Sequence, residues 1–180
     1  MNKSVNIIMA TILIVPVIIL ADKNDISLED KTKAAFIYNF TRYIEWPEDT
    51  VPTFTIAVFG DSKILAPLRE IGKKKLVGKK KIRIIHYQDI SKIDTCHMLF
   101  VSGSEKDKLE EILLTSRNKN ILTLSDTKGF AQKGVALNFR VVKEKLRFEI
   151  NSEALDGLNV HVSSQLLKLA LFVKGKKKHE

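Results

Sequence analysis

Two aspartates stand where α/β sheets commonly bind ligands. Asp61 follows the apolar run 54–59 and Gly60, and Asp126 follows the run 121–125. Both runs have the length and composition of buried strands. Ligands often sit at the carboxyl ends of parallel strands, so we predict a small-molecule pocket beside Asp61 and Asp126. The alternative for Asp126 is a turn residue whose carboxylate bonds its own backbone.

Cys96 and His97 are the residues whose chemistry best suits a metal ion, together with a carboxylate from elsewhere. Neighbouring residues of a strand point to opposite faces, however, so we predict no metal site. The chain has one cysteine, which excludes a disulfide within the chain. Cys96 is therefore either a buried apolar residue or a link between molecules.

The usual catalytic and cofactor motifs are absent from the sequence. It has no GxGxxG or GxxxxGK[ST] phosphate loop and no GxSxG nucleophile turn. None of its four histidines has the spacing of an HExxH zinc motif. We therefore predict no catalytic residue and no cofactor, and we do not expect an enzyme.

Two exposed segments could instead bind a protein partner. Tyr43 and Trp46 lie at the end of a predicted helix, where Trp46 is either an aromatic anchor or part of the core. Lys73, Lys74 and Lys75 begin a lysine-rich loop over 72–80, in a chain of net charge +9. Such a cluster is either a solvated loop or a contact for an acidic partner or anionic lipid. No nucleic-acid-binding motif accompanies the charge, so nucleic acid is not an expected partner.

The first residues resemble a secretory signal peptide. Lys3 precedes an apolar run that ends at Ala21, just before a charged stretch. The alternative is a membrane anchor, although the run is shorter than the roughly 20 residues that span a bilayer. We predict a signal peptide over 1–21, a lead-in over 22–30, one domain over 31–174 and a basic tail over 175–180. Export places the domain in the periplasm.

The remaining pattern predicts one α/β domain. Helical spacing or the capping residues Ser27, Ser102, Asn151 and Ser163 indicate helices over 28–44, 64–71, 106–117, 151–158 and from Ser163 to about 173. Strands are expected over 54–59, 81–87, 97–101 and 121–125, followed by a hairpin over 135–141 and 145–150. Alternating strands and helices favour parallel pairing, and the hairpin adds antiparallel strands. We predict an α/β sandwich around a mixed, partly parallel sheet of about six strands.

These segments, taken in order, resemble the YfiR-like periplasmic proteins. The resemblance runs from about residue 31 to residue 173. It rests on KAAFIYNF at 33–40, YIEWP at 43–47, IAVFGD at 56–61, CHMLF at 96–100, LTLSD at 122–126, VALNF at 135–139, LRFEIN at 146–151 and SSQLLKLA at 163–170.

The resemblance implies a non-catalytic regulator. In this family an exported protein represses a membrane-bound diguanylate cyclase by binding its periplasmic sensor portion, which lowers cyclic di-GMP output and biofilm formation. An outer-membrane lipoprotein can sequester the repressor, and the family's α/β domains form homodimers. The alternative is a periplasmic small-molecule sensor or carrier that uses the pocket at Asp61 and Asp126.

Overall fold

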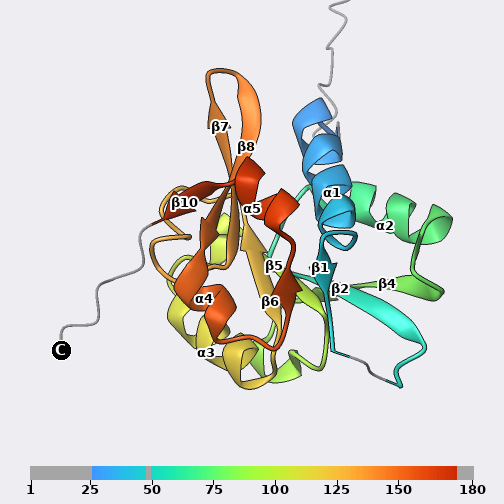
Figure 1. Cartoon of the computed structure of the whole chain (residues 1–180). Helices are drawn as coiled ribbons and strands as arrows, with labels where there is room; N and C mark the ends of the chain where they lie inside the picture. The colour runs from blue at the N-terminus through green and yellow to red at the C-terminus, as the bar shows by residue number, and fades with distance from the viewer. Residues whose placement is uncertain (1–25, 48–49, 174–180) are drawn as a thin grey trace, which may run out of the picture.

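The structure is a computed structural model that describes residues 26–47 and 50–173 (Figure 1). The predicted signal peptide and the basic tail lie outside the described residues, as do residues 22–25 of the lead-in. No helix in the described ranges is long and apolar enough to cross a membrane.

The domain is built on a mixed sheet of eight strands, in the order β10-β8-β7-β6-β5-β2-β4-β3. The neighbours β4, β2, β5, β6 and β7 are all parallel, whereas β3 and β8 are antiparallel to β4 and β7. The strands are β2 (Thr53–Phe59), β3 (Leu76–Val77), β4 (Lys80–Tyr87), β5 (Met98–Val101), β6 (Leu122–Ser125), β7 (Leu137–Val142), β8 (Lys145–Asn151) and β10 (Leu171–Val173).

This topology confirms the predicted α/β sandwich with a mixed sheet. All six expected strands are present, and β3 and β10 extend the sheet at its two edges. A separate pair joins β1 (Ile44–Glu45) to β9 (His161–Val162) in antiparallel register.

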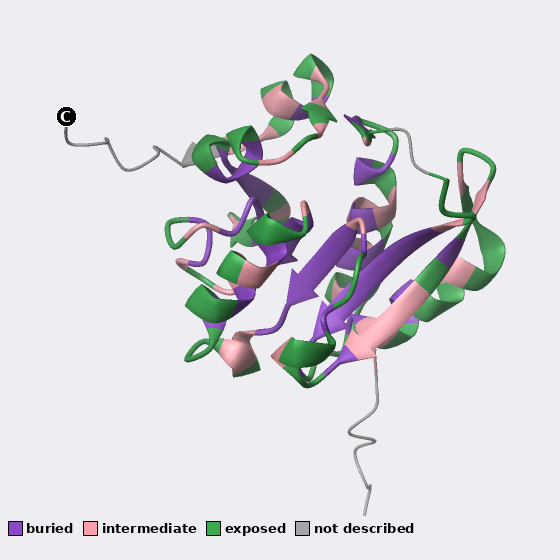
Figure 2. Cartoon of the chain, turned by 90° about the horizontal axis from the view of Figure 1, so that it is seen from below, coloured by how far each residue is buried: buried purple, intermediate pink, exposed green. Residues whose placement is uncertain are grey.

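Helices cover both faces of the sheet and divide the core in two (Figures 1 and 2). The larger cluster lies beneath α1 (Leu28–Phe40), α2 (Leu65–Lys74), α4 (Ser152–Asp156) and α5 (Ser164–Leu169). The smaller cluster lies beneath α3 (Leu109–Asn118) and includes Ile93, just after the 3-10 turn η1 (Ile90–Lys92). Aromatic rings of α1 pack on the β7–β8 hairpin, where Phe40 stacks on Phe139 with centroids 5.8 Å apart.

The first helix begins where the sequence predicts and ends earlier. The Ser27 hydroxyl accepts from the Asp30 amide at 3.0 Å, which confirms the N-cap. The helix ends at Phe40 rather than near residue 44. The reason is tertiary, since Ile44 and Glu45 form backbone pairs with β9 instead of a further helical turn.

Two other predicted boundaries are wrong. The lysine-rich segment is not one loop, because α2 continues through Lys74 and β3 then pairs with β4. Ser102 does not cap a helix at Lys106: its hydroxyl caps the short 3-10 turn η2 (Gly103–Glu105), and α3 starts at Leu109.

Only the first part of the last predicted helix is helical, and its end is a strand. Ser163 caps α5 through the Leu166 amide, as expected, but α5 ends at Leu169. Residues 171–173 pair in parallel with β8 instead. The sequence reads as a nearly continuous apolar run there, and such a run does not distinguish a buried helix from a strand. Leu169, the last residue of α5, is 59% exposed.

Candidate functional site

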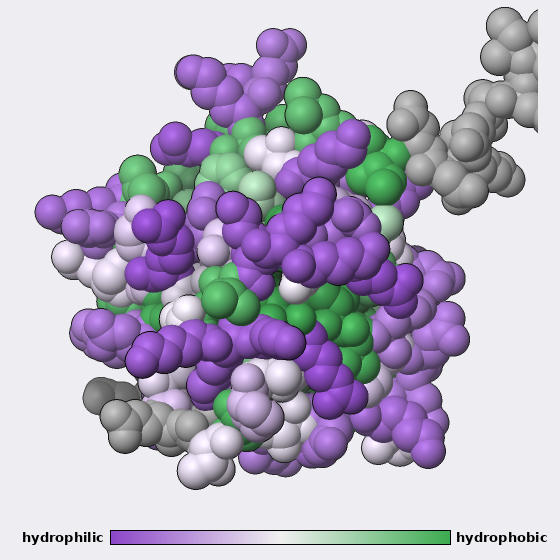
Figure 3. Space-filling model, turned by 90° about the vertical axis from the view of Figure 1, so that its right-hand side faces the viewer, coloured by the Kyte–Doolittle hydropathy of each residue, from purple (hydrophilic) through white to green (hydrophobic). Residues whose placement is uncertain are grey.

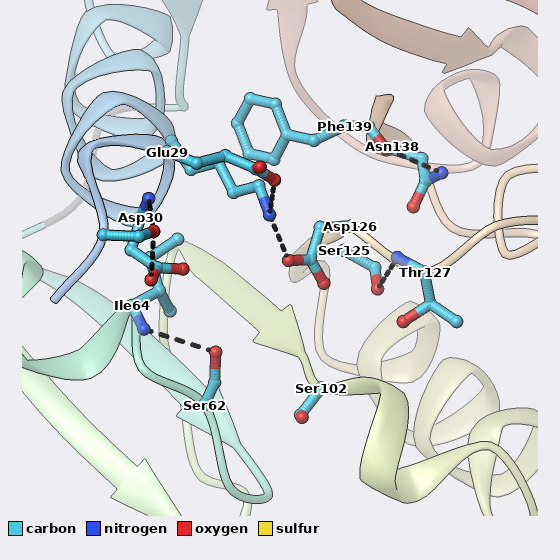
Figure 4. A network of polar contacts seen from close by, with 12 residues as sticks. Glu29, Asp30, Ser62, Ile64, Ser102, Ser125, Asp126, Thr127, Asn138 and Phe139 are labelled. Atoms are coloured by element: carbon cyan, nitrogen blue, oxygen red, sulfur yellow. Dashed lines mark hydrogen bonds and ion pairs between the residues drawn. The ribbon is translucent and has the colours of Figure 1, made fainter. Parts of the chain in front are cut away.

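Asp126 lies at the carboxyl end of β6, where the sequence placed a ligand residue. Its Oδ2 atom accepts a hydrogen bond from Lys33 Nζ at 2.6 Å, and Lys33 Nζ also lies 2.7 Å from Glu29 Oε1 (Figure 4). The carboxylate therefore ties the first turns of α1 to the sheet. It also lines a hollow of about 300 Å³ with Lys128, Phe139, Arg140 and Val141.

Lys33 is a buried cation held by two carboxylates. Burial lowers the pKa of its ammonium, but hydrogen bonds and charge interactions with Asp126 and Glu29 outweigh that effect. The pKa of Lys33 is therefore raised above its usual value. The charged form is the one that the fold stabilises, which makes this cluster a structural clamp at neutral pH.

Asp61 lies at the carboxyl end of β2, separated from β6 by β5. Its side chain is exposed, and its backbone carbonyl accepts a hydrogen bond from Ser102 Oγ at 2.5 Å. The hollow beside Asp126 does not include Asp61 in its lining. The two aspartates thus share one edge of the sheet without lining one cavity.

Trp46 packs at the opposite edge of the sheet, near the amino ends of β2 and β5. Its ring meets Phe54 edge-on with centroids 4.8 Å apart, and Phe54 stacks on His97 at 4.2 Å. The indole nitrogen Nε1 is buried and has no hydrogen-bond partner among the described residues. An indole N–H is a donor only, so this atom lacks an acceptor.

A groove of about 480 Å³ runs beside this indole, and we call it the Trp46 groove. Its wall on the far side comes from the β3–β4 hairpin, where the lysine-rich segment ends. Its lining residues are Thr41, Ile44, Trp46, Pro47, Phe54, Val77, Gly78, Lys80 and His97. The structure therefore brings two segments together that the sequence could only treat separately.

The other predicted partner residues do not line this groove. Tyr43 lies in the turn before β1 and is 37% exposed. Lys73 and Lys74 are in the last turn of α2, where both pair with Glu70, at 2.7 and 3.9 Å, and exposed Lys75 leads into β3. Viewed from the side of α2 and β4, apolar surface shows between hydrophilic side chains (Figure 3).

Cys96 faces away from the groove, into the smaller core cluster with Tyr87 and Ile93. Burial raises the pKa of its thiol to about 12, and the Asp94 charge adds to the shift. His97 faces the other way and lines the groove. Its Nδ1 atom accepts a hydrogen bond from the Thr55 amide at 3.1 Å. Among the described residues no group of three or more histidine, cysteine and carboxylate side chains could hold a metal ion.

A comparison with known protein families finds one that matches the chain. The model of the YfiR/HmsC-like family matches residues 30–171, most of the sequence. The chain belongs to the YfiR/HmsC-like family. This membership confirms the resemblance drawn from the sequence motifs, and the match covers both the Asp126 and the Trp46 ends of the sheet. No curated protein matches the chain.

Sequence reasoning missed Lys33 and Asn138. Lys33 precedes Ile37 by one helical turn, so it sits on the buried stripe of α1, and a lysine there signals a partnered charge. Asn138 lies between Leu137 and Phe139 in a buried strand and is 1% exposed. A lone amide in an apolar strand was the available signal.

Proposed function

We propose that this YfiR/HmsC-like protein is an exported, non-catalytic regulator. It acts in the periplasm, where it binds the sensor portion of an inner-membrane signalling protein and holds that protein inactive. A diguanylate cyclase is the partner that the family resemblance favours. An outer-membrane lipoprotein that sequesters the regulator, and a homodimeric state, belong to the same proposal.

The Trp46 groove is the observation that carries the proposal. It joins an aromatic anchor to apolar neighbours such as Ile44 and Val77 and holds a buried donor that has no acceptor among the described residues. An unpaired buried polar atom costs on the order of 1–3 kcal/mol. A partner that inserts a backbone carbonyl or a carboxylate beside Trp46 Nε1 would recover this energy on binding.

The charge around the groove favours an acidic partner. Lys73, Lys74 and Lys75 carry three positive charges against the single carboxylate of Glu70. The side chains of Lys73 and Lys74 are 70% and 72% exposed, so their attraction acts mainly on the rate of encounter and is screened by salt. We expect capture of the partner to weaken as ionic strength rises.

Repression requires a difference in affinity between two states of the partner. A regulator that binds the inactive state tenfold more tightly than the active state shifts the equilibrium by about 1.4 kcal/mol. The orphan donor of Trp46 can supply a difference of that size if only the inactive state presents the acceptor.

Affinity capture tests the proposal. The tagged mature protein is retrieved from envelopes solubilised in mild detergent, and its companions are identified by mass spectrometry. The informative variant is Trp46→Phe, which keeps a smaller aromatic ring beside Phe54 and removes the indole N–H. A second pair compares Lys75→Glu, beside the groove, with Lys106→Glu, an exposed lysine before α3.

We expect wild-type protein and Lys106→Glu to retain one inner-membrane signalling protein, and Trp46→Phe and Lys75→Glu to lose most of it. Failure of the wild-type protein to retain any membrane protein would contradict the proposed function. Retention of the same protein by Trp46→Phe would keep the function and remove the groove from it.

A further inference from the structure

A row of polar side chains is buried on one face of the sheet. Ser125, Asn138 and Glu149 are paired in register across β6, β7 and β8, and their exposures are 0%, 1% and 4%. The opposite face of these strands carries Leu124, Phe139 and other residues of the larger core. Burying polar groups is unfavourable unless each finds a hydrogen-bond partner.

Two members of the row are satisfied. Ser125 Oγ donates to the Val101 carbonyl at 2.7 Å and accepts from the Thr127 amide at 3.2 Å. One carboxylate oxygen of Glu149 accepts a hydrogen bond from Arg140 Nη1 at 2.9 Å, and the other accepts one from Asn138 Nδ2 at 3.3 Å. Each buried donor and acceptor of these two side chains therefore has a partner.

The remaining atom, Asn138 Oδ1, has no partner among the described residues. The orientation of this amide follows from its neighbour, because an ionised Glu149 only accepts and so must face the NH2 group. Figure 4 shows the Asn138 oxygen directed away from Phe139, toward the loop that carries Asp126 and Thr127. A fully buried acceptor is thus left open.

A cavity of about 300 Å³ lies against this row, and we call it the Asn138 cavity. Its lining residues are Lys128, Gly129, Gln132, Asn138, Arg140 and Glu149. It shares Lys128 and Arg140 with the hollow beside Asp126. The volume is at the lower end of the range for small-molecule sites.

One positively charged side chain in the lining of the Asn138 cavity has no ion-pair partner among the described residues. Glu149 is paired with Arg140, and Lys128 makes no ion pair within the described ranges. Asp126, in the adjoining hollow, is already paired with Lys33. The cavity therefore presents an unmatched ammonium, which calls for an anion, and the buried Asn138 Oδ1, which calls for a donor.

We propose that the Asn138 cavity binds a small carboxylate that also carries a hydrogen-bond donor, either a hydroxyl or an amino group. The carboxylate lies against Lys128 and the free N–H groups of Arg140, and the donor meets Asn138 Oδ1. Binding there does not depend on the protein's partner.

The test uses three probes of one size: lactate, alanine and propionate. Lactate and alanine join the carboxylate to a hydroxyl and an ammonium group, respectively, and propionate has neither. Binding to the mature protein is followed by amide chemical shifts, which detect millimolar affinities. The variants are Lys128→Gln and, as the matched control in the same loop, Lys133→Gln, which lines a different hollow.

We expect saturable shifts at Lys128 and Gly129 with lactate or alanine, and about tenfold weaker binding of propionate, because it leaves the buried oxygen unpaired. Lys128→Gln should weaken binding about tenfold, and Lys133→Gln should leave it within about twofold. Whichever of lactate and alanine binds more tightly identifies the donor. Absence of saturable binding, equal binding of propionate, or equal loss in both variants would overturn the proposal.

Discussion

The Trp46 groove lies near the amino ends of β2 and β5, whereas the Asn138 cavity lies against β7 and β8, beside the carboxyl end of β6. Each holds one buried polar atom that has no partner in the described part of the chain, but this atom is a donor in the groove and an acceptor in the cavity. The groove is built from core aromatic residues, Trp46 on Phe54. The cavity is built from a loop laid over polar side chains, Lys128 and Gln132 over Asn138. The first suits a protein surface and the second suits a small polar molecule.

One row of the sheet shows how the difference arises. Phe59, Val101, Ser125, Asn138 and Glu149 are successive neighbours across β2, β5, β6, β7 and β8. The two apolar members belong to the smaller core cluster, beneath α3. The three polar members form hydrogen bonds instead of belonging to either apolar cluster. One row of the sheet thus carries apolar core residues at one end and the residues of a polar cavity at the other.

The largest expected effect comes from the floor of the groove. Phe54 is 3% exposed, so Phe54→Ala should lower the free energy of unfolding by about 3 kcal/mol through lost burial and a new cavity. Gln132→Ala, at the exposed wall of the Asn138 cavity, should change it by less than about 0.5 kcal/mol. Urea denaturation at neutral pH measures both, and equal losses would contradict the contrast between the two regions.

Lys33 tests the clamp beside the cavity. Lys33→Met should lower stability by about 2 kcal/mol, because Asp126 loses a buried partner, while the exposure of Glu29 limits the loss. The pKa of Lys33 is raised in the folded state, so its contribution is complete below the unfolded value of 10.5 and is lost as pH rises through the folded pKa. Unfolding curves from neutral to strongly alkaline pH should show an alkaline loss that is smaller in the variant. An identical alkaline slope in both proteins would exclude Lys33 as its source.

Sequence reasoning succeeded where the signal is local and failed where partners are distant. Ser27 and Ser163 cap their helices as predicted, and the predicted hairpin is present, with its turn at Lys143 and Glu144, whose φ angles are 48° and 61°. The pairing of residues 171–173 with β8 depends on an open sheet edge that no local pattern reveals.

The candidate sites divide in the same way. The placement of Asp61 and Asp126 at the carboxyl ends of strands follows from local strand patterns. The approach of Val77 to Trp46 and the pairing of Lys33 with Asp126 join residues far apart in sequence. Only the tertiary structure could show them.

We expect the Cys96 thiol to be unreactive in the folded protein. Burial raises the pKa of its thiol from 9.0 to about 12, so the native protein should react very slowly with a thiol reagent at pH 8, and the unfolded protein should react fully. Since the unfolded thiol ionises first, this group should reduce stability as pH rises from 9.0 to about 12. Rapid labelling of the folded protein would show that Cys96 is accessible.

Trp46→Phe should have only a small effect on stability. The lost indole N–H has no partner within the described part of the chain, so its removal costs no hydrogen bond, and the smaller ring should cost less than about 1 kcal/mol. Thermal unfolding of the free variant measures this. A much larger loss would mean that Trp46 is chiefly a core residue.

Crosslinking from the two hollows tests the central claim most directly. A photoreactive amino acid replaces Val77 in the Trp46 groove or Val141 beside the Asn138 cavity, and cells are irradiated with the partner at its native level. The account predicts an adduct with an inner-membrane signalling protein from position 77 and none from position 141. An adduct from position 141 alone would contradict it, because the partner would then lie at the polar end of the sheet.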